Sequence, residues 1–185
     1  MTGLIAPQLH PLPFTGFSCM RHQLFSVRHL WVAIAIAAVW LWGWSQSAIA
    51  GSIDPYVLQY LKAANPVELQ ANSQGQTQTF TPEDLTEGKA LFKQNCLNCH
   101  VGGATLPSPT VSLSLDALAG ATPPRDSIEG LVNYMRVPMT YDGSEENYFC
   151  REVPESWMSQ TQVDNLAAFI LRAAQKAPGW GAKTF

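Results

Sequence analysis

The pentapeptide Cys96-Leu97-Asn98-Cys99-His100 constrains the fold of this chain more than any other feature. In a C-x-x-C-H motif, two thioether bonds tether a haem c, and the adjacent imidazole takes one axial position of the iron. A thioredoxin-type cysteine pair would need a βαβ setting, and a zinc site would need two more ligands nearby; the sequence offers neither. The motif therefore predicts one covalently attached haem c, with His100 as an iron ligand and Cys96 and Cys99 as the attachment points.

The first fifty residues have the pattern of an export signal. A basic stretch at 21–29 precedes an apolar run at 30–44, and Ala48-Ile49-Ala50 follows as a small-residue cleavage site. A retained transmembrane anchor is the alternative, but the run of about 15 residues is shorter than the roughly 20 that span a bilayer. We therefore predict a cleaved signal peptide over residues 1–50 and a single c-type haem domain over residues 51–185.

Removal of this signal leaves an acidic domain with one histidine and one cysteine outside the pair in the haem motif. Residues 51–185 carry 9 Lys and Arg against 14 Asp and Glu, a net charge of −5 before any cofactor. Such a surface argues against nucleic acid as a partner and suits a basic docking protein. His100 is the only histidine that remains, and Cys150 is a third cysteine outside the haem motif. Export to an oxidising compartment agrees with a haem that is attached after export.

Capping signals and hydrophobic spacing predict a mainly α-helical domain with one small hairpin. Residues 67–80 are polar and β-prone around an Asn-Ser-Gln-Gly turn, which indicates the hairpin. Thr81-Pro82-Glu83-Asp84 predicts the start of a helix that runs into the haem motif. Further helices are expected at 127–136 and, with an amphipathic pattern, at 161–174. The short amphipathic run at 56–61 predicts either a first helix or an extended arm.

Gly88 and Phe92 lie four residues apart on one face of the helix that leads into the haem motif. A glycine at that position permits close helix contact, with the aromatic ring packed beside it. We therefore expect this helix to cross the C-terminal helix at 161–174. The apolar stripes of both helices predict core packing, and no direct chemistry is assigned to Phe92 or Phe169.

Together these features resemble class I cytochrome c, and a more specific set of motifs resembles the photosystem II extrinsic cytochrome c-550 (PsbV) family. The general likeness rests on the helix with Gly88 and Phe92, the C-x-x-C-H motif and the C-terminal Leu-Ala-Ala-Phe-Ile sequence. The specific likeness covers most of residues 65–185 and is strongest at 99–103, 121–135, 140–143 and 179–183.

That resemblance implies a class I cytochrome c fold and a monohaem electron-transfer protein of the thylakoid lumen, peripheral to the membrane, with an unusually low redox potential. The partners it implies are a redox protein or the lumenal surface of photosystem II. A structural photosystem II subunit and a haem sensor with a dissociable sixth ligand are the competing functions. Enzymatic turnover is not expected, because the domain has no histidine left to act as a distal acid or base.

The chain departs from the family at the second axial ligand. Family members carry a histidine in a Val-His-Pro context a few residues beyond Tyr-Asp-Gly, whereas this chain reads Ser-Glu-Glu-Asn-Tyr-Phe-Cys150 after Gly143. When the Tyr-Asp-Gly motifs are aligned, Cys150 falls close to the family's histidine, and thiolate is an established haem ligand. The chain therefore resembles a divergent, cytochrome c-550-like paralogue.

Several groups could take the sixth position of the iron. Cys150 is the predicted ligand, because an unpaired exported cysteine is a liability unless something such as iron holds it. Met139, Met158 and Met135 are the alternatives, and water or an open position is another. Cys150 could instead be an inert buried thiol or form an intermolecular disulfide. Thiolate ligation would predict a very low potential, because a thiolate stabilises the ferric state.

Overall fold

The computed structural model describes residues 31–32, 34, 52–106 and 111–182. The predicted signal peptide lies almost entirely outside this part of the chain, so its cleavage before Gly51 stays a prediction. Residues 51–185 form a unit of their own, distinct from residues 1–50. Within the described ranges, no helix has both the length and the apolar character needed to cross a bilayer.

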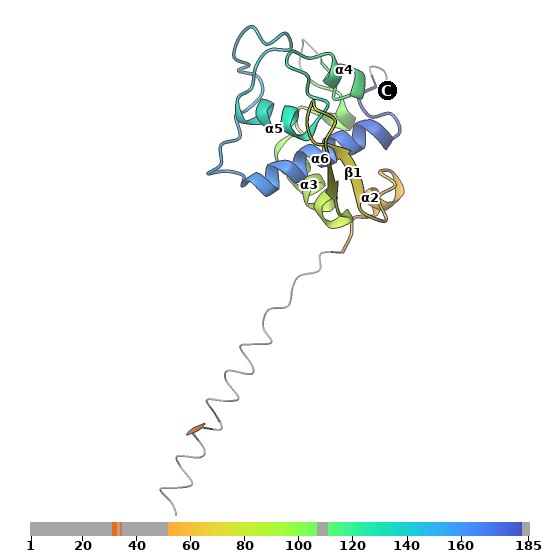
Figure 1. The fold of residues 1–185 in the computed structure, drawn as a ribbon, viewed down its shortest axis with the longest axis vertical. Coiled ribbons are helices and arrows are strands. Elements are labelled where there is room, and N and C mark those ends of the chain that lie inside the picture. The colour runs from red at the N-terminus through yellow and green to blue at the C-terminus, as the bar shows by residue number, and fades with distance from the viewer. Residues whose placement is uncertain (1–30, 33, 35–51, 107–110, 183–185) are drawn as a thin grey trace, which may run out of the picture. The chain divides into compact units, whose positions relative to one another are not determined.

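The domain is mainly helical, with one small antiparallel sheet near its N-terminal end (Figure 1). Its described elements, in chain order, are α2 (Pro55–Gln59), β1 (Val67–Gln70), β2 (Thr77–Phe80), α3 (Pro82–Asn95), the 3-10 turn η1 (Val101–Gly103), α4 (Leu115–Ala119), α5 (Ile128–Arg136) and α6 (Gln160–Lys176). The predicted arrangement of helices around one small hairpin is confirmed.

The hairpin forms where the polar, β-prone segment predicted it. Strands β1 and β2 pair with Val67 opposite Phe80. In the connecting turn, the Asn72 side chain accepts hydrogen bonds from the backbone N–H groups of Gln74 and Gln76 at 3.1 and 3.3 Å. An asparagine that binds its own backbone in this way stabilises a turn locally, which is why the sequence alone could locate it.

Side-chain caps define where the helices begin. Thr81 and Asp84 form a capping box at the start of α3, in which the Thr81 hydroxyl accepts from the Asp84 backbone N–H and the Asp84 carboxylate accepts from that of Thr81. Ser159 and Gln162 form a second capping box, so α6 begins one residue earlier than predicted. Asp54 caps α2 by accepting from Tyr56 N at 2.7 Å, which makes this segment a helix rather than an extended arm.

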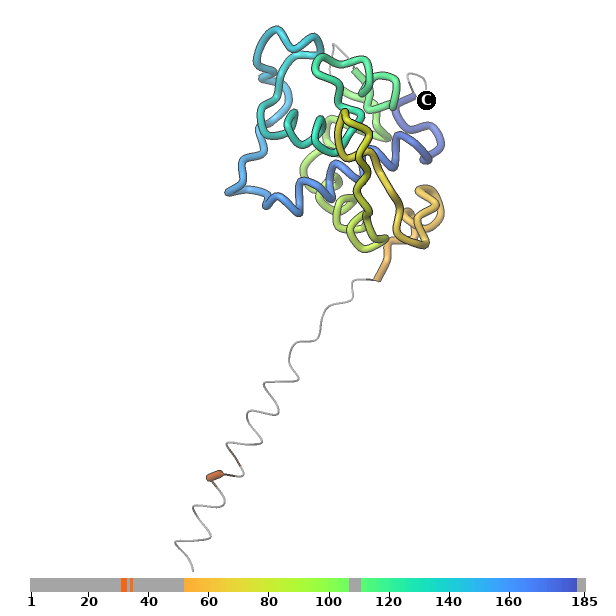
Figure 2. The backbone as a smooth tube through the Cα atoms, in the orientation of Figure 1, coloured from red at the N-terminus to blue at the C-terminus, as the bar shows by residue number. Residues whose placement is uncertain are grey.

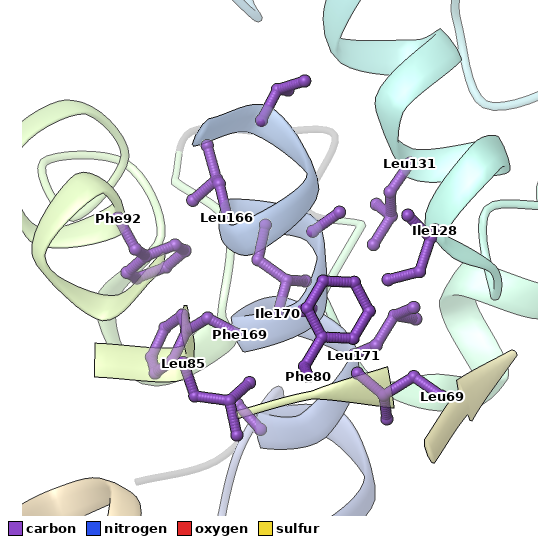
Figure 3. Packing of buried hydrophobic residues seen from close by; sticks show 14 of the residues in the cluster. Leu69, Phe80, Leu85, Phe92, Ile128, Leu131, Leu166, Phe169, Ile170 and Leu171 are labelled. Carbon is purple, nitrogen blue, oxygen red and sulfur yellow. The ribbon is translucent and has the colours of Figure 1, made fainter. Parts of the chain in front are cut away.

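Helices α3 and α6 cross at Gly88, as predicted. A Cβ atom at Gly88 would lie 2.0 Å from the Asn165 carbonyl oxygen, so only a glycine lets the two backbones approach this closely. The Phe92 and Phe169 rings meet beside this crossing, with centroids 5.3 Å apart. Figure 3 shows side chains of α6 at the centre of the core, between those of α3 on one side and those of α5 and the hairpin on the other. Its labelled residues are Leu69, Phe80, Leu85, Phe92, Ile128, Leu131, Leu166, Phe169, Ile170 and Leu171.

The backbone between α5 and α6 runs through residues 137–159 without a helix or a strand (Figure 2). A single bridge pairs Met139 with Glu146 inside this segment. The bridge is made by the bonds from Asn147 N to Pro138 O at 2.9 Å and from Thr140 N to Glu145 O at 2.8 Å, and a bond from Val153 N to Met135 O at 2.8 Å ties the segment to α5. This irregular segment carries Cys150.

Candidate haem site

Helix α3 delivers the C-x-x-C-H motif. The helix ends at Asn95, and Cys96 caps it by donating its backbone N–H to Phe92 O at 2.9 Å. The chain then turns tightly, with the N–H groups of Cys99 and His100 both donating to Cys96 O at 3.1 and 2.9 Å. This turn brings all three motif side chains to the wall of one cavity. Neither cysteine of the motif is in a disulfide.

The cavity has a volume of about 290 Å³ and is lined mainly by apolar side chains. Its walls come from α3, α4, α5, α6 and the loops between them. Among the described residues that line it, Arg125 is the only one that carries a full charge. An apolar cavity with a few converging polar groups is the usual form of a small-molecule or cofactor site.

His100 has the protonation pattern that an iron ligand requires. The Thr105 hydroxyl donates to Val111 O, so its oxygen is left to accept a hydrogen bond from His100 Nδ1, which is 3.0 Å away. With its proton on Nδ1, the imidazole keeps the lone pair of Nε2 for a metal. Burial lowers the pKa of His100, which favours the neutral ring further.

Cys150 faces the same cavity as the haem motif. Burial raises the pKa of the Cys150 thiol, while a hydrogen bond with Tyr134 and the charge of Arg125 lower it and the nearby Cys99 raises it. Burial also raises the pKa of Cys96 to about 12, with Cys150 and Cys99 adding to the shift. All three cysteines line the same cavity, although Cys150 lies about fifty residues beyond the motif.

The three predicted alternative ligands lie in different places. Met135 lines the cavity from α5. Met158 does not line it, and its side chain is buried in the hydrophobic core. Met139 is also outside the cavity wall and takes part in the bridge with Glu146. The structure therefore brings His100, Cys150 and Met135 together, and it places the other two methionines elsewhere.

Trp180, after the end of α6, packs beside the haem motif without lining the cavity. Its ring packs against Phe92 and Phe169 with centroids 5.4 and 5.8 Å apart, and its Nε1 donates to Leu113 O at 3.0 Å. Gly181 N donates to Gly102 O at 2.8 Å, next to the haem motif. The turn after α6 therefore contacts both the motif and the loop that precedes α4.

A polar group beside Cys150 was not predicted from the sequence. The Arg125 guanidinium carbon lies 3.8 Å from the centre of the Tyr134 ring, and Asn147 Nδ2 donates to the Tyr134 hydroxyl at 3.1 Å. All three side chains line the cavity. The spacing of Leu131, Tyr134 and Met135 on one face of α5 was the signal that could have pointed to Tyr134.

Comparison with known proteins assigns the chain to a family. The model of the cytochrome c-550 domain matches residues 60–185. The chain belongs to the cytochrome c-550 family. A cytochrome c-550-like protein of Thermosynechococcus vestitus is 57% identical over 149 residues, which are 78% of this chain and 85% of the relative. Photosystem II extrinsic protein V of Gloeobacter violaceus is 56% identical over 128 residues, 69% of each chain.

A solved structure agrees with the same assignment. The crystal structure of the PsbV2 cytochrome from Thermosynechococcus elongatus matches with a TM-score of 0.69 and 62% sequence identity, over 70% of this chain and 99% of that one. The predicted class I cytochrome c fold is thereby confirmed. The family consists of electron-transfer cytochromes related to photosystem II, which implies haem c as the cofactor.

Proposed function

We propose that this chain is a monohaem electron-transfer protein of the thylakoid lumen, with one haem c attached through Cys96 and Cys99. In this proposal His100 and Cys150 are the two axial ligands, and the redox potential is low. The observation that carries it is the placement of Cys150 on the wall of the cavity that also holds Cys96, Cys99 and His100. The neutral, Nδ1-protonated form of His100 supports its part of the assignment.

Different residues of the chain would have different roles in such a site. A bound haem supplies a one-electron ferric and ferrous couple. His100 offers Nε2, and its Nδ1–H bond with Thr105 fixes the orientation of the ring. Cys150 would bring a negative charge to the opposite axial position, which favours the ferric state and lowers the potential. The apolar lining would shield a bound haem from water, and electrons would pass on the side of the exposed Cys99.

The proposed location and partners rest on the signal peptide, on the net charge of the domain and on its homologues. A cleaved signal peptide over residues 1–50 would export the domain, and its net charge of −5 suits a basic surface. A redox protein or the lumenal face of photosystem II is the proposed partner, with the protein peripheral to the thylakoid membrane. A relative named photosystem II extrinsic protein V, at 56% identity, supports the second of these.

The test compares ferric optical and EPR spectra of the wild-type holoprotein with those of Cys150→Ser. Loss of a low-spin histidine and thiolate signature in Cys150→Ser is the expected result. Met135→Leu is the matched control, because this residue also lines the cavity and offers sulfur; its spectra should equal those of the wild type. Unchanged spectra in Cys150→Ser would remove Cys150 as the ligand.

A structural role in photosystem II is the second candidate, favoured by the same relative. Here the haem would mainly stabilise the fold. Isolation of photosystem II from the native organism separates the two functions: stable co-purification supports the structural role, and absence from complexes that retain the ordinary family member supports the electron carrier. Carbon monoxide binding to the reduced wild-type protein would instead indicate a sensor with a dissociable sixth ligand.

A further inference from the structure

Arg125 is a charged residue in the wall of a mainly apolar cavity. It is only 8% exposed, and no other described residue of the cavity wall carries a full charge. The one ion pair in the described part of the chain joins Lys89 to Asp54, so no carboxylate of these residues balances the Arg125 guanidinium. Burial lowers the pKa of Arg125, but an arginine stays protonated in proteins. A buried positive charge therefore lacks an anion, which is costly in free energy.

The protein uses only part of this guanidinium. Nη2 donates to the carbonyl oxygens of Met139 and Thr140 at 3.1 and 2.7 Å. The other N–H donors, on Nε and Nη1, make no hydrogen bond to the described residues, although every fully enclosed side-chain nitrogen and oxygen there has a partner. Nε and Nη1 are therefore within reach of open space, and the open space that Arg125 lines is the haem cavity.

Both the backbone and the side chain of Arg125 are held in place. Its backbone N–H donates to Leu118 O at 2.9 Å, and its guanidinium carbon lies 3.8 Å from the centre of the Tyr134 ring. At Gly130, in the first turn of α5, a Cβ atom would lie 2.5 Å from Pro124 O and 3.2 Å from Arg125 Cα, so the glycine lets α5 lie directly against this backbone. The free donors of Arg125 are thus fixed in advance of any ligand.

The chemistry of a haem c fits this wall of the cavity. Its only anionic side groups are two propionate carboxylates, at the edge away from the two thioether bonds. The predicted attachment points, Cys96 and Cys99, follow α3, whereas Arg125 precedes α5. A positively charged donor without a carboxylate partner, in the wall opposite the attachment motif in the sequence order of the elements, suits one of these propionates.

We propose that Arg125 is the propionate-binding residue of the haem site: the guanidinium N–H groups that the protein leaves free donate to one haem propionate, and this ion pair keeps the carboxyl ionised in an apolar cavity. The inference rests on the proposed haem attachment through Cys96 and Cys99, and it does not depend on which group is the sixth ligand. Since the same guanidinium binds Met139 O and Thr140 O, it also joins the haem edge to the start of the segment at 137–159.

The experiment measures the protonation of the propionates in the holoprotein. Cells that express the protein are fed 5-aminolaevulinate labelled with 13C at its carboxyl carbon, which places the label in the two propionate carboxyls. Isotope-edited infrared spectra over a pH series then give the protonated fraction of these groups. A nearby opposite charge weakens the proton affinity of a carboxylate by about tenfold or more, so Arg125→Gln should raise that of one propionate by about tenfold. Arg125→Lys keeps the positive charge and should stay closer to the wild type.

Arg136→Gln is the matched control for the loss of backbone contacts. Arg136 also donates to two carbonyl oxygens of the segment at 137–159, those of Val153 and Met158, but it does not line the cavity. Its replacement should leave the propionate titration unchanged. The inference is overturned if Arg125→Gln leaves that titration unchanged, or if Arg136→Gln changes it as much.

A separate measurement of covalent haem, by the pyridine haemochrome spectrum, distinguishes this inference from the proposed function. Absence of attached haem in the wild type refutes both, whereas attached haem with an unchanged titration in Arg125→Gln refutes only the inference. Should Arg125→Gln not take up haem, a crystal structure of the wild-type holoprotein decides. A propionate oxygen within hydrogen-bond distance of the Arg125 guanidinium supports the ion pair, and its absence refutes it.

Discussion

Replacing Gly88 with alanine tests the helix crossing that supports the haem motif. The added Cβ would lie 2.0 Å from the Asn165 carbonyl oxygen and 2.9 Å from Phe169 Cβ, where real Cβ atoms essentially never come within 3.0 Å. The nearest obstacle is backbone of α6, which cannot rotate away as a side chain could. Helices α3 and α6 would therefore have to separate by about 1 Å at this point.

The cost can be worked out from two opposing effects. Overpacking costs about 1–3 kcal/mol, and the upper end applies here because a separation of 0.5–1 Å loses roughly a quarter to a half of the dispersion energy of the contacts involved. Alanine regains about 1 kcal/mol through its higher helix propensity. The net loss in the free energy of unfolding should be about 2 kcal/mol, which lowers the urea midpoint by about 1 M.

Urea denaturation of the holoprotein, followed by far-UV circular dichroism, measures this loss. Gln94→Ala is the control on the same helix, because Gln94 is exposed and its replacement should change stability by less than about 0.5 kcal/mol. A Gly88→Ala protein as stable as the wild type, or more stable, would mean that helix propensity outweighs the contact and that α3 and α6 do not cross as closely as described.

Three further variants test local interactions. Thr105→Val removes the acceptor for His100 Nδ1–H, which makes the imidazole a weaker electron donor to iron. The midpoint potential should rise by the equivalent of about 1 kcal/mol. Thr105→Ser keeps the hydroxyl and should leave the potential unchanged. Thr81→Ala removes the cap of α3 and should lower the free energy of unfolding, measured in urea, by about 1 kcal/mol. Thr81→Ser should retain most of this stability. Burial raises the pKa of the Asp54 carboxyl, but the ion pair with Lys89 and a backbone hydrogen bond from Tyr56 outweigh this and hold the pKa below its usual range. This stabilisation, under about 1 kcal/mol for so exposed a pair, is present above the unfolded pKa near 3.9 and is lost as pH falls through the lower folded pKa. Lys89→Met should therefore be less stable than the wild type at pH 7, and the difference should shrink as the solution is acidified below that range.

Local signals explain which elements could be predicted. The hairpin turn around Asn72 and the α3 start at Thr81 are each stabilised by side chains within a few residues of the backbone they bind. The motif cysteines and His100 are equally local, since one turn after α3 brings them together. Helix α4 was missed because it has only five residues, too few for a hydrophobic period, and Ser114 was its one capping signal.

The surroundings of Cys150 could not be predicted in this way, because they come from separate parts of the chain. Arg125 precedes α5, Tyr134 lies within it and Asn147 follows it. Each is a common residue type without a motif of its own, and the contact among them exists only after the segment at 137–159 has folded back over the cavity.

Two arginines hold that segment where secondary structure does not. Carbonyl groups of irregular backbone need hydrogen-bond donors, and here two arginine guanidinium groups supply several of them. Arg125 binds two carbonyls at the start of the segment, and Arg136 donates to Val153 O and Met158 O at 2.7 and 3.0 Å near its end. Cys150 lies between these two anchored ends of the segment, so its place at the cavity depends on one side chain before α5 and one at its last residue rather than on a helix or strand of its own. Under the proposed ligation by Cys150, this irregular segment is where a family could exchange one axial group for another while α3, α6 and the haem motif keep their arrangement.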